Sequence, residues 1–398
     1  MTATQAPAPA VGSGRRWAML AASTLAQVAT AVMVHGPAFL IPALHAQGLS
    51  LARAGLVAAA PTVGVMLTLV AWGAVTDRRG ERFVLLAGLS GTAVAGLAAV
   101  LTTSTAALTA ALFLAGAAAA STNAAGGRLV VGWFPAERRG LAMGIRQMAQ
   151  PVGVGLAALT VATTAAAAGT SAALAVPTLA CALAVAVVAV VVADPPRPER
   201  RDHPAAANPY RQDSFLARVH GVSVLLVVPQ FLVWTFALVW LVQDRDWSPA
   251  AAGAVVAVAQ VTGALGRIGV GHLSDVVGSR MRPLRWVAVA AAATMALLGL
   301  AAALDLAVAV LLVVVATCVT VADNGLAFTA VAERAGPFWA GRALGVQNTV
   351  QFLTASAVPP CAGLAVTHLG YAATFALAAA FPVLAAPLVP VRGERDLT

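Results

Sequence analysis

Long apolar segments follow one another along almost the whole 398-residue chain, and short breaks carrying charge, glycine or proline separate them. A helix that crosses a bilayer needs roughly 20 mostly apolar residues. By that measure the chain holds twelve candidate spans, six on each side of a polar interval. They are expected near 17–43, 53–76, 83–103, 106–132, 141–168 and 171–193, and near 215–242, 249–273, 284–303, 306–332, 342–366 and 370–391.

The composition is that of a helical membrane protein. Hydrophobic residues make up 60% of the chain, charged residues only 10%, and the mean hydropathy is +0.87. These values exclude a water-soluble domain, which needs a charged surface. The net charge of +9 does not indicate nucleic-acid binding, because the 24 basic residues are all arginines spread over short loops. The three cysteines are isolated in apolar segments, so neither a disulfide framework nor a metal site is indicated.

The placement of arginine predicts the orientation in the membrane. With a cytoplasmic N-terminus, 19 of the 24 arginines fall on the inner side, as the positive-inside rule requires. The first apolar run is too long for a cleavable signal peptide. We therefore expect both termini and the polar interval to be cytoplasmic, in a cell-membrane protein that crosses the bilayer many times. The expected parts are a tail at 1–16, a six-helix bundle at 17–193, a linker at 194–213, a second bundle at 214–391 and a tail at 392–398.

A charged turn with the spacing Gly-x3-Asp-x2-Gly-x-Arg occurs once in each half, at an offset of 198 residues. Its members are Gly73, Asp77, Arg78, Gly80 and Arg82 in the first copy, and Gly271, Asp275, Gly278 and Arg280 in the second. At an offset of 201, Asn123 aligns with Asn324. Six spans per half is an even number, so the halves share one orientation and form parallel repeats.

Twelve spans, a parallel duplication, a cytoplasmic middle loop and this turn resemble the major facilitator superfamily over essentially the whole chain. The first copy, GAVTDRRGERF, is close to the signature loop of that family, and the second, GHLSDVVGSRM, lacks the arginine after Asp275. The segments RGLAMGIRQMAQPVG, DNGLAF and GRALGVQNTVQ are similar to the cyanate-permease and nitrate/nitrite-porter-like branch. An antiporter signature in helix 5 is matched only in part by Gln150-Pro151-Val-Gly153-Val-Gly155. The resemblance implies an all-α major facilitator fold and a secondary active transporter that works by alternating access.

The two charged turns are predicted to act as gates. Asp77 and Asp275 each follow the cytoplasmic end of a helix, where the helix dipole is unfavourable for a negative charge. They gain stability if they meet an arginine or a helix N-terminus from a neighbour, and such contacts can hold one transport state closed. The alternative is that these are ordinary polar loops, rich in arginine because of topology alone.

Four charged residues fall within the predicted spans: Arg128, Arg146, Arg267 and Asp323. Three positive charges against one negative charge favour an anionic substrate, since guanidinium matches carboxylate and oxyanion geometry. Arg128 has the alternative of bracing Asp77. Arg267 lies eight residues before Asp275 on nearly the same helix face, so a structural pairing there is equally open, and we group it with the gate.

Polar side chains extend this interior set. Helix 5 offers Gln147 and Gln150 beside Arg146, and helix 11 offers Gln347, Asn348 and Gln351 at repeat-related positions; with Asn123 and Arg128 these are the candidate substrate-binding residues. Asp323 and His35 are the candidates for coupling to protons. The plainer alternatives are interhelical hydrogen bonding for the amides, a buried ion pair for Asp323 and a structural role for His35.

The sequence therefore predicts a monomeric, proton-coupled secondary active transporter of a small organic or inorganic anion. It predicts no cofactor and no enzymatic activity, because the chain has no nucleotide-binding loop and no catalytic or metal constellation near a membrane face. Two other functions stay open. One is a proton-coupled exporter of drugs or metabolites, and the other is a non-transporting membrane sensor built on a transporter fold.

Overall fold

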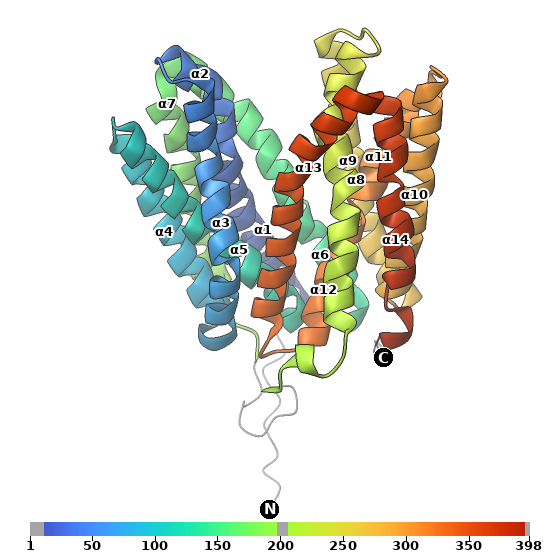
Figure 1. Cartoon of the computed structure of the whole chain (residues 1–398). Helices are drawn as coiled ribbons and strands as arrows, with labels where there is room; N and C mark the ends of the chain where they lie inside the picture. The colour runs from blue at the N-terminus through green and yellow to red at the C-terminus, as the bar shows by residue number, and fades with distance from the viewer. Residues whose placement is uncertain (1–11, 197–205, 395–398) are drawn as a thin grey trace, which may run out of the picture. The chain divides into compact units, whose positions relative to one another are not determined.

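The computed structural model describes residues 12–196 and 206–394, and in those ranges it contains helices and no strand (Figure 1). Most of the expected N-terminal tail, residues 197–205 of the expected linker and residues 395–398 lie outside the described part of the chain. Ten described segments are long and apolar enough to cross a membrane. Two of them, of 56 and 54 residues, are each long enough for two crossings of about 20 residues. The twelve predicted spans are thereby accounted for.

The chain forms two compact units. The first holds the described residues up to Phe134 and those from Val152 to Ala207, and the second holds Pro135–Pro151 and the described residues from Asn208 onward. The predicted bundle boundaries thus differ from these units in one respect, since residues 135–151 pack with the second unit.

The helices of the first unit follow in chain order (Figure 1). They are α1 (Ser13–His35), the 3₁₀ turn η1 (Gly36–Leu40), α2 (Ile41–Ala46), α3 (Leu51–Arg79), α4 (Glu81–Leu101), α5 (Thr105–Trp133) and most of α7 (Ala149–Val191). The second unit begins with α6 (Ala136–Gln147) and the short η3 (Pro209–Arg211). It continues with α8 (Phe215–Gln243), α9 (Pro249–Val277), α10 (Met281–Ala303), α11 (Val308–Thr320), α12 (Asp323–Ala335), α13 (Ala340–Ala378), α14 (Ala380–Leu388) and η4 (Val391–Gly393).

The predicted repeat is visible in how the helices begin and end. Helices α3 and α9 have 29 residues each, and the serine before each one, Ser50 or Ser248, accepts a hydrogen bond from a backbone N–H of the first turn. Such N-caps satisfy donors that a helix start leaves unpaired. Glycines at repeat-related positions, Gly169 (φ 85°) and Gly370 (φ 81°), break α7 and α13 in a backbone conformation that favours glycine. Each break separates two crossings of the membrane.

Helix 10 of the predicted topology is discontinuous. It consists of α11 and α12, with a turn at Val321 and Ala322, so that α12 begins at Asp323. Helix 5 is likewise divided at Met148 between α6 and α7. Broken helices within a transporter expose backbone dipoles at the level of a binding site. Both breaks lie beside predicted site residues.

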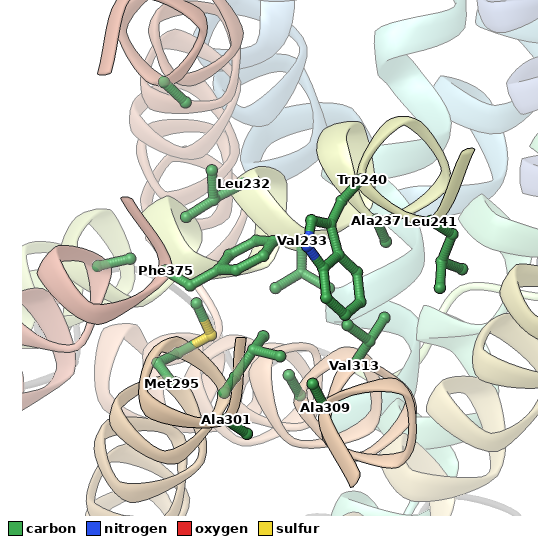
Figure 2. Close-up of a cluster of buried hydrophobic side chains, with 14 of the residues drawn as sticks. Leu232, Val233, Ala237, Trp240, Leu241, Met295, Ala301, Ala309, Val313 and Phe375 are labelled. Carbon is green, nitrogen blue, oxygen red and sulfur yellow. The ribbon is translucent and has the colours of Figure 1, made fainter. Parts of the chain in front are cut away.

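The second unit is held together by an apolar cluster from α8, α10, α11 and α13 (Figure 2). At its centre the Trp240 indole meets the Phe375 ring edge-on, with ring centroids 5.8 Å apart. Met295 and Val313 pack around this pair and are fully buried. Such aromatic contacts fix the rotation of α8 against α13, and that rotation positions the polar residues described next.

Candidate functional site

The first charged turn is closed by an arginine from α5. Arg128 forms ion pairs with Asp77 (3.5 Å) and with Glu81 (2.9 Å), and its Nη1 also donates to the Thr76 carbonyl (3.1 Å). All three charged side chains are almost fully buried. One guanidinium therefore serves two carboxylates, and these contacts are those of the loop brace that was the alternative for Arg128. The placement of Arg128 in the substrate site remains a prediction, and its contacts with Asp77 and Glu81 support the structural alternative instead.

The remainder of this turn faces outward or binds the end of α7. The backbone N–H of Arg82 donates to Asp194 (2.9 Å), and its side chain donates to the Ala189 carbonyl (2.7 Å). Gly80 has φ 103°, which makes the turn between α3 and α4 a glycine position. Arg78 is exposed, and Gly73 is buried within α3. The turn is thus anchored at both ends of the motif.

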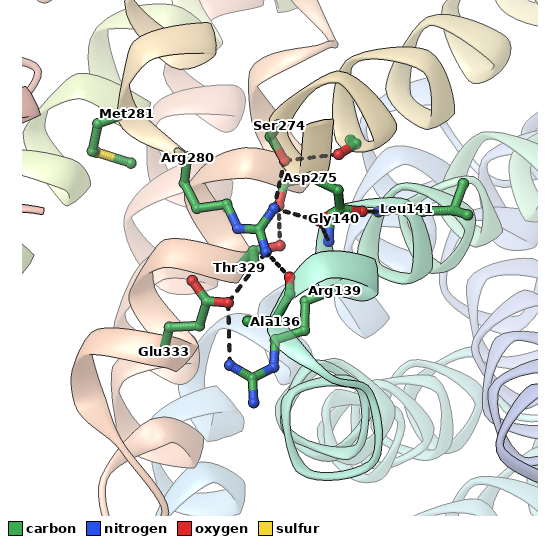
Figure 3. Close-up of polar contacts among 12 residues, drawn as sticks. Ala136, Arg139, Gly140, Leu141, Ser274, Asp275, Arg280, Met281, Thr329 and Glu333 are labelled. Carbon is green, nitrogen blue, oxygen red and sulfur yellow. Dashed lines mark hydrogen bonds and ion pairs between the residues drawn. The ribbon is translucent and has the colours of Figure 1, made fainter. Parts of the chain in front are cut away.

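The second charged turn has a different partner (Figure 3). Asp275 accepts hydrogen bonds from the backbone N–H groups of Gly140 (2.9 Å) and Leu141 (2.8 Å) in α6. Arg280, the last residue of the same motif, donates to Asp275 (2.5 Å) and to the Ala136 carbonyl (2.5 Å). A carboxylate that accepts two backbone N–H groups and one guanidinium is fully compensated.

Glu333 of α12 completes this cluster by facing two arginines, Arg139 and Arg280, each at 3.4 Å (Figure 3). Gly278 closes the turn in the left-handed conformation, φ 65°. The eight-residue spacing between Arg267 and Asp275 does not produce a pair, because Asp275 binds Arg280 instead. We therefore place Arg267 with the interior residues.

Four polar side chains of the second unit form an interior charge cluster, comprising Arg146, Gln147, Arg267 and Asp323. Arg146 donates to the Gln147 side-chain oxygen (3.0 Å), and Arg267 donates to the Gln147 backbone carbonyl (2.6 Å). Their exposed fractions are 1% for Arg146, 5% for Arg267 and 1% for Asp323. The cluster thus brings together two predicted binding residues, the predicted coupling acid and a predicted gate residue.

Asp323 is the least satisfied member of the cluster. Arg267 supplies its neighbouring positive charge, and the backbone amides of Asp323 and Asn324 lie near it at the start of α12. Neither carboxylate oxygen accepts a hydrogen bond of normal geometry from the described residues. A buried carboxylate in this state costs free energy unless it is neutralised or finds a partner. Asp323 is therefore suited to exchange a proton or a hydrogen-bonding ligand.

A hydrogen-bonded pair of side-chain amides occurs inside each unit. Gln27 on α1 donates to Asn123 on α5 (3.1 Å), and within the second unit Asn324 on α12 donates to Gln230 on α8 (3.1 Å). Gln351 on α13 also donates to Asn324 (3.0 Å). The interhelical bonding offered as the alternative for these amides is present, and it occurs at repeat-related positions.

The other predicted residues take varied positions. Gln347 is fully buried and bonded to α8, while the Asn348 side chain bonds the Leu344 carbonyl of its own helix (2.9 Å). Gln150 is half-buried in the first turn of α7, and His35 is half-buried at the end of α1.

Three further polar residues, Glu81, Tyr210 and His220, were not predicted from the sequence. His220 lies near the start of an apolar run, three residues before Ser223. That one-turn spacing on α8 is the only local signal of a shared polar face.

The fold and these contacts can be compared with known proteins. The family model for the Major Facilitator Superfamily matches residues 19–359. An uncharacterized MFS-type transporter of Mycobacterium tuberculosis (strain ATCC 25618 / H37Rv), Rv2994, is 46% identical over 384 residues, which cover 96% of this chain and 86% of that protein.

Two solved structures have the same fold. The proton:xylose symporter XylE superposes with a TM-score of 0.77 at 15% identity, covering 97% of this chain and 98% of that one. The human organic anion transporter MFSD10 superposes with a TM-score of 0.73 at 17% identity, covering 94% and 99%. The all-helical fold with two six-helix repeats, the family model and the near full-length relative agree. The chain belongs to the major facilitator superfamily, and it is a multi-pass membrane transporter rather than an enzyme.

Proposed function

We propose that this transporter moves a small organic or inorganic anion across the cytoplasmic membrane, coupled to protons, as a monomer with both termini in the cytoplasm. The observation that supports it is the interior charge cluster of Arg146, Gln147, Arg267 and Asp323. The cluster holds two buried guanidinium groups and one buried carboxylate, so it carries an excess positive charge when all three are ionised. An anion is the ligand that removes this excess at the lowest cost.

Coupling follows from Asp323. Protonation of this carboxylate removes its attraction for Arg267 and makes that guanidinium available to the anion. The proton and the anion then enter the same cluster together, because each lowers the cost of the other. The titratable partner predicted alongside it, His35, lies at the end of α1 in the first unit.

The substrate class is tested by a thermal-shift and uptake screen of the purified protein against nitrate, cyanate, formate and lactate at two pH values. Nitrate and cyanate are included because of the resemblance of helices 5, 10 and 11 to the cyanate-permease and nitrate/nitrite-porter-like branch. A ligand of the folded state raises its melting temperature in proportion to the logarithm of its concentration above Kd. We expect at least one of these anions to stabilise the protein and to be taken up into proteoliposomes.

The residues are tested by Arg146→Gln, which removes the charge while keeping an amide donor. Loss of a charge-assisted hydrogen bond of about 1.5–3 kcal/mol weakens anion binding roughly 10- to 100-fold. The control is Arg53→Gln, which removes an arginine from an exposed position at the start of α3. Unchanged affinity in Arg146→Gln would rule out this site.

The role of the Arg267 and Asp323 charges is tested by a double variant, because Arg267→Met alone leaves the buried Asp323 carboxylate without its neighbouring positive charge. The double variant Arg267→Met/Asp323→Leu removes both charges, so it is expected to fold and yet to lose proton-coupled uptake. Stabilisation by lipophilic cations in place of anions would favour the drug or metabolite exporter. Ligand binding without flux in proteoliposomes would favour the membrane sensor.

The cytoplasmic position of the C-terminus is tested by fusing a fluorescent protein to it. We expect the fusion to fluoresce, as such a protein does in the cytoplasm.

A further inference from the structure

A chain of hydrogen bonds in the second unit leads from the linker to a predicted substrate residue. The Tyr210 hydroxyl in η3 lies 2.9 Å from Nε2 of His220 on α8. The other ring nitrogen, Nδ1, lies 2.5 Å from Oε1 of Gln347 on α13. Gln347 in turn donates from Nε2 to the Ser223 hydroxyl (2.6 Å). The Tyr210 and His220 rings are stacked, with centroids 5.9 Å apart.

The direction of each hydrogen bond is fixed by the amide. Because the Gln347 oxygen can only accept, Nδ1 of His220 must carry the hydrogen and donate. Nε2 of the neutral ring is then a lone pair that accepts from the Tyr210 hydroxyl. His220 therefore has one vacant position for a proton, and that position points to the linker.

The two ends of this hydrogen-bond chain differ in their burial. Gln347 and Ser223 are fully buried and His220 is 7% exposed, whereas Tyr210 is only partly buried. Tyr210 is held in place by its neighbour, since the Asn208 side chain accepts from the Tyr210 backbone N–H (3.0 Å). Burial raises the pKa of Tyr210 to about 12, so its hydroxyl remains a donor. The tyrosine is therefore the outer end of the chain.

The charged groups near this chain are engaged elsewhere. Arg218, two residues before His220 on α8, donates to backbone carbonyls of α14. Arg334 of α12 forms an ion pair with Asp213 of the linker. Arg342 of α13 lies over an indole ring, 3.6 Å from its centroid. The polar contacts of the His220 ring in the described chain are those with Tyr210 and Gln347.

We propose that His220 is a proton-binding site of this transporter, reached through Tyr210 and hydrogen-bonded to Gln347, a predicted substrate residue. The first half of this inference stands on the hydrogen-bond chain itself, and the link to an anion rests on the proposed function. Within residues 12–196 and 206–394, no other residue combines a buried imidazole with a partly exposed donor and a predicted substrate amide.

The proton transfer balances without any further reactant. A proton from water binds the Tyr210 oxygen as the phenolic hydrogen moves to Nε2 of His220, which becomes an imidazolium. The Tyr210 oxygen then accepts from the new Nε2–H. The Nδ1–H bond to Gln347 becomes charge-assisted, and such bonds are roughly twice as strong as neutral ones. The amide oxygen cannot pass the proton on, so the transfer ends at His220.

The consequence for transport is a linkage between proton and anion. A positive charge one hydrogen bond from Gln347 raises the affinity of its surroundings for an anion, and an anion bound there favours protonated His220 by the same factor. His220 is thereby a positioning residue that acts through Gln347 and need not touch the substrate.

The proton site is tested by ¹⁵N NMR of histidine-labelled protein in nanodiscs. The chain has six histidines, and the signal absent from His220→Gln identifies the relevant one. We expect the neutral ring to carry its hydrogen on Nδ1. We also expect Tyr210→Phe to shift the titration of this histidine, and Tyr371→Phe, which changes the only other tyrosine, to leave it unchanged. A hydrogen on Nε2 in the neutral parent, or a titration insensitive to Tyr210→Phe, would overturn the proposal.

The link to the anion is tested by measuring Kd for the nitrate, cyanate, formate and lactate panel above and below the NMR titration midpoint. We expect acidification through the midpoint to tighten binding about fivefold or more in the parent. His220→Gln should lose the change in Kd that the parent shows at this midpoint, while His368→Gln, at an exposed position, should keep it. A change in Kd at the same midpoint in His220→Gln would overturn the link. Failure of every anion to bind the parent would overturn the anion proposal and with it the link, whereas the NMR result decides the proton site separately.

Discussion

The crossing of α6 and α9 in the second unit offers a sharp test of the structure. A methyl group added at Gly140 would lie 2.2 Å from the backbone carbonyl oxygen of Gly271 and 2.4 Å from the Ser274 hydroxyl. The carbonyl belongs to a helix and cannot rotate away. Carbon and oxygen at van der Waals contact require about 1 Å more than this, so in Gly140→Ala the two helices must separate.

The separation has two costs. Overpacking between helices costs about 1–3 kcal/mol. The same movement lengthens the hydrogen bonds from Gly140 and Leu141 to Asp275, each a charge-assisted bond of about 1.5–3 kcal/mol when fully made. Alanine returns about 1 kcal/mol through its higher helix propensity. The expected net loss is about 2–4 kcal/mol, or a melting temperature lower by about 4 °C or more.

Melting of the purified protein followed by tryptophan fluorescence measures this loss. The control is Gly269→Ala, on the same helix two residues from Gly271, where an added methyl meets nothing within 4 Å. Gly269→Ala should melt at or slightly above the parent temperature. Gly271→Ala should reproduce the loss, because its methyl would lie 2.3 Å from the Gly140 carbonyl oxygen. Equal melting of Gly140→Ala and Gly269→Ala would refute the close crossing.

Two further substitutions test the charged turns by the same melting assay. Asp275→Asn leaves the Arg280 guanidinium, 1% exposed, without a full counter-charge, and should cost about 3–5 kcal/mol. Arg128→Met strands two buried carboxylates, Asp77 and Glu81, and should cost at least as much, with partial recovery at low pH as the carboxylates become protonated. A melting temperature within one degree or so of the parent in either variant would show that these ion pairs are not stabilising.

The sequence predicted the features of the fold that depend on local chemistry. The charged turns follow α3 and α9, and each of these helices starts at a serine cap and stops at a glycine with positive φ. The length of an apolar segment, its capping residue and its terminal glycine can each be read from a few neighbouring residues. The same signals recur in the second half at the 198-residue offset.

The partners of the charged residues were less accessible to sequence reasoning. Asp77 and Asp275 occupy equivalent places, yet one binds a guanidinium from α5 and the other binds backbone N–H groups of α6. The partner of each aspartate depends on how two helices are rotated about their own axes. That rotation is set by the packing of apolar residues. The same holds for His220, whose partners lie 10 and 127 residues away. The break before Asp323 has no glycine or proline to signal it.

Comparison of the two repeats shows which residues maintain the scaffold and which are specialised. The Gln27–Asn123 and Gln230–Asn324 bonds recur in both units, so they serve a need that both bundles share, namely holding the first and fourth helices of each repeat together. One residue before each asparagine the repeats diverge. In the first unit Thr122 shares a hydrogen bond with Thr30 (2.9 Å).

The equivalent of Thr122 in the second unit is Asp323, and the position matching Thr30 in the register of the glutamine pairs is Val233, a member of the apolar cluster in Figure 2. The acid has therefore lost the hydroxyl partner that its counterpart has, and Arg267 replaces a buried leucine, Leu69, at the offset of the charged turns. A neutral hydroxyl pair has been exchanged for a buried carboxylate and a guanidinium. Since a hydroxyl pair would satisfy the scaffold at lower cost, this exchange is best explained by a function of the charges themselves. We therefore expect Asp323→Thr with Arg267→Leu to melt at or above the parent temperature and to lose anion uptake.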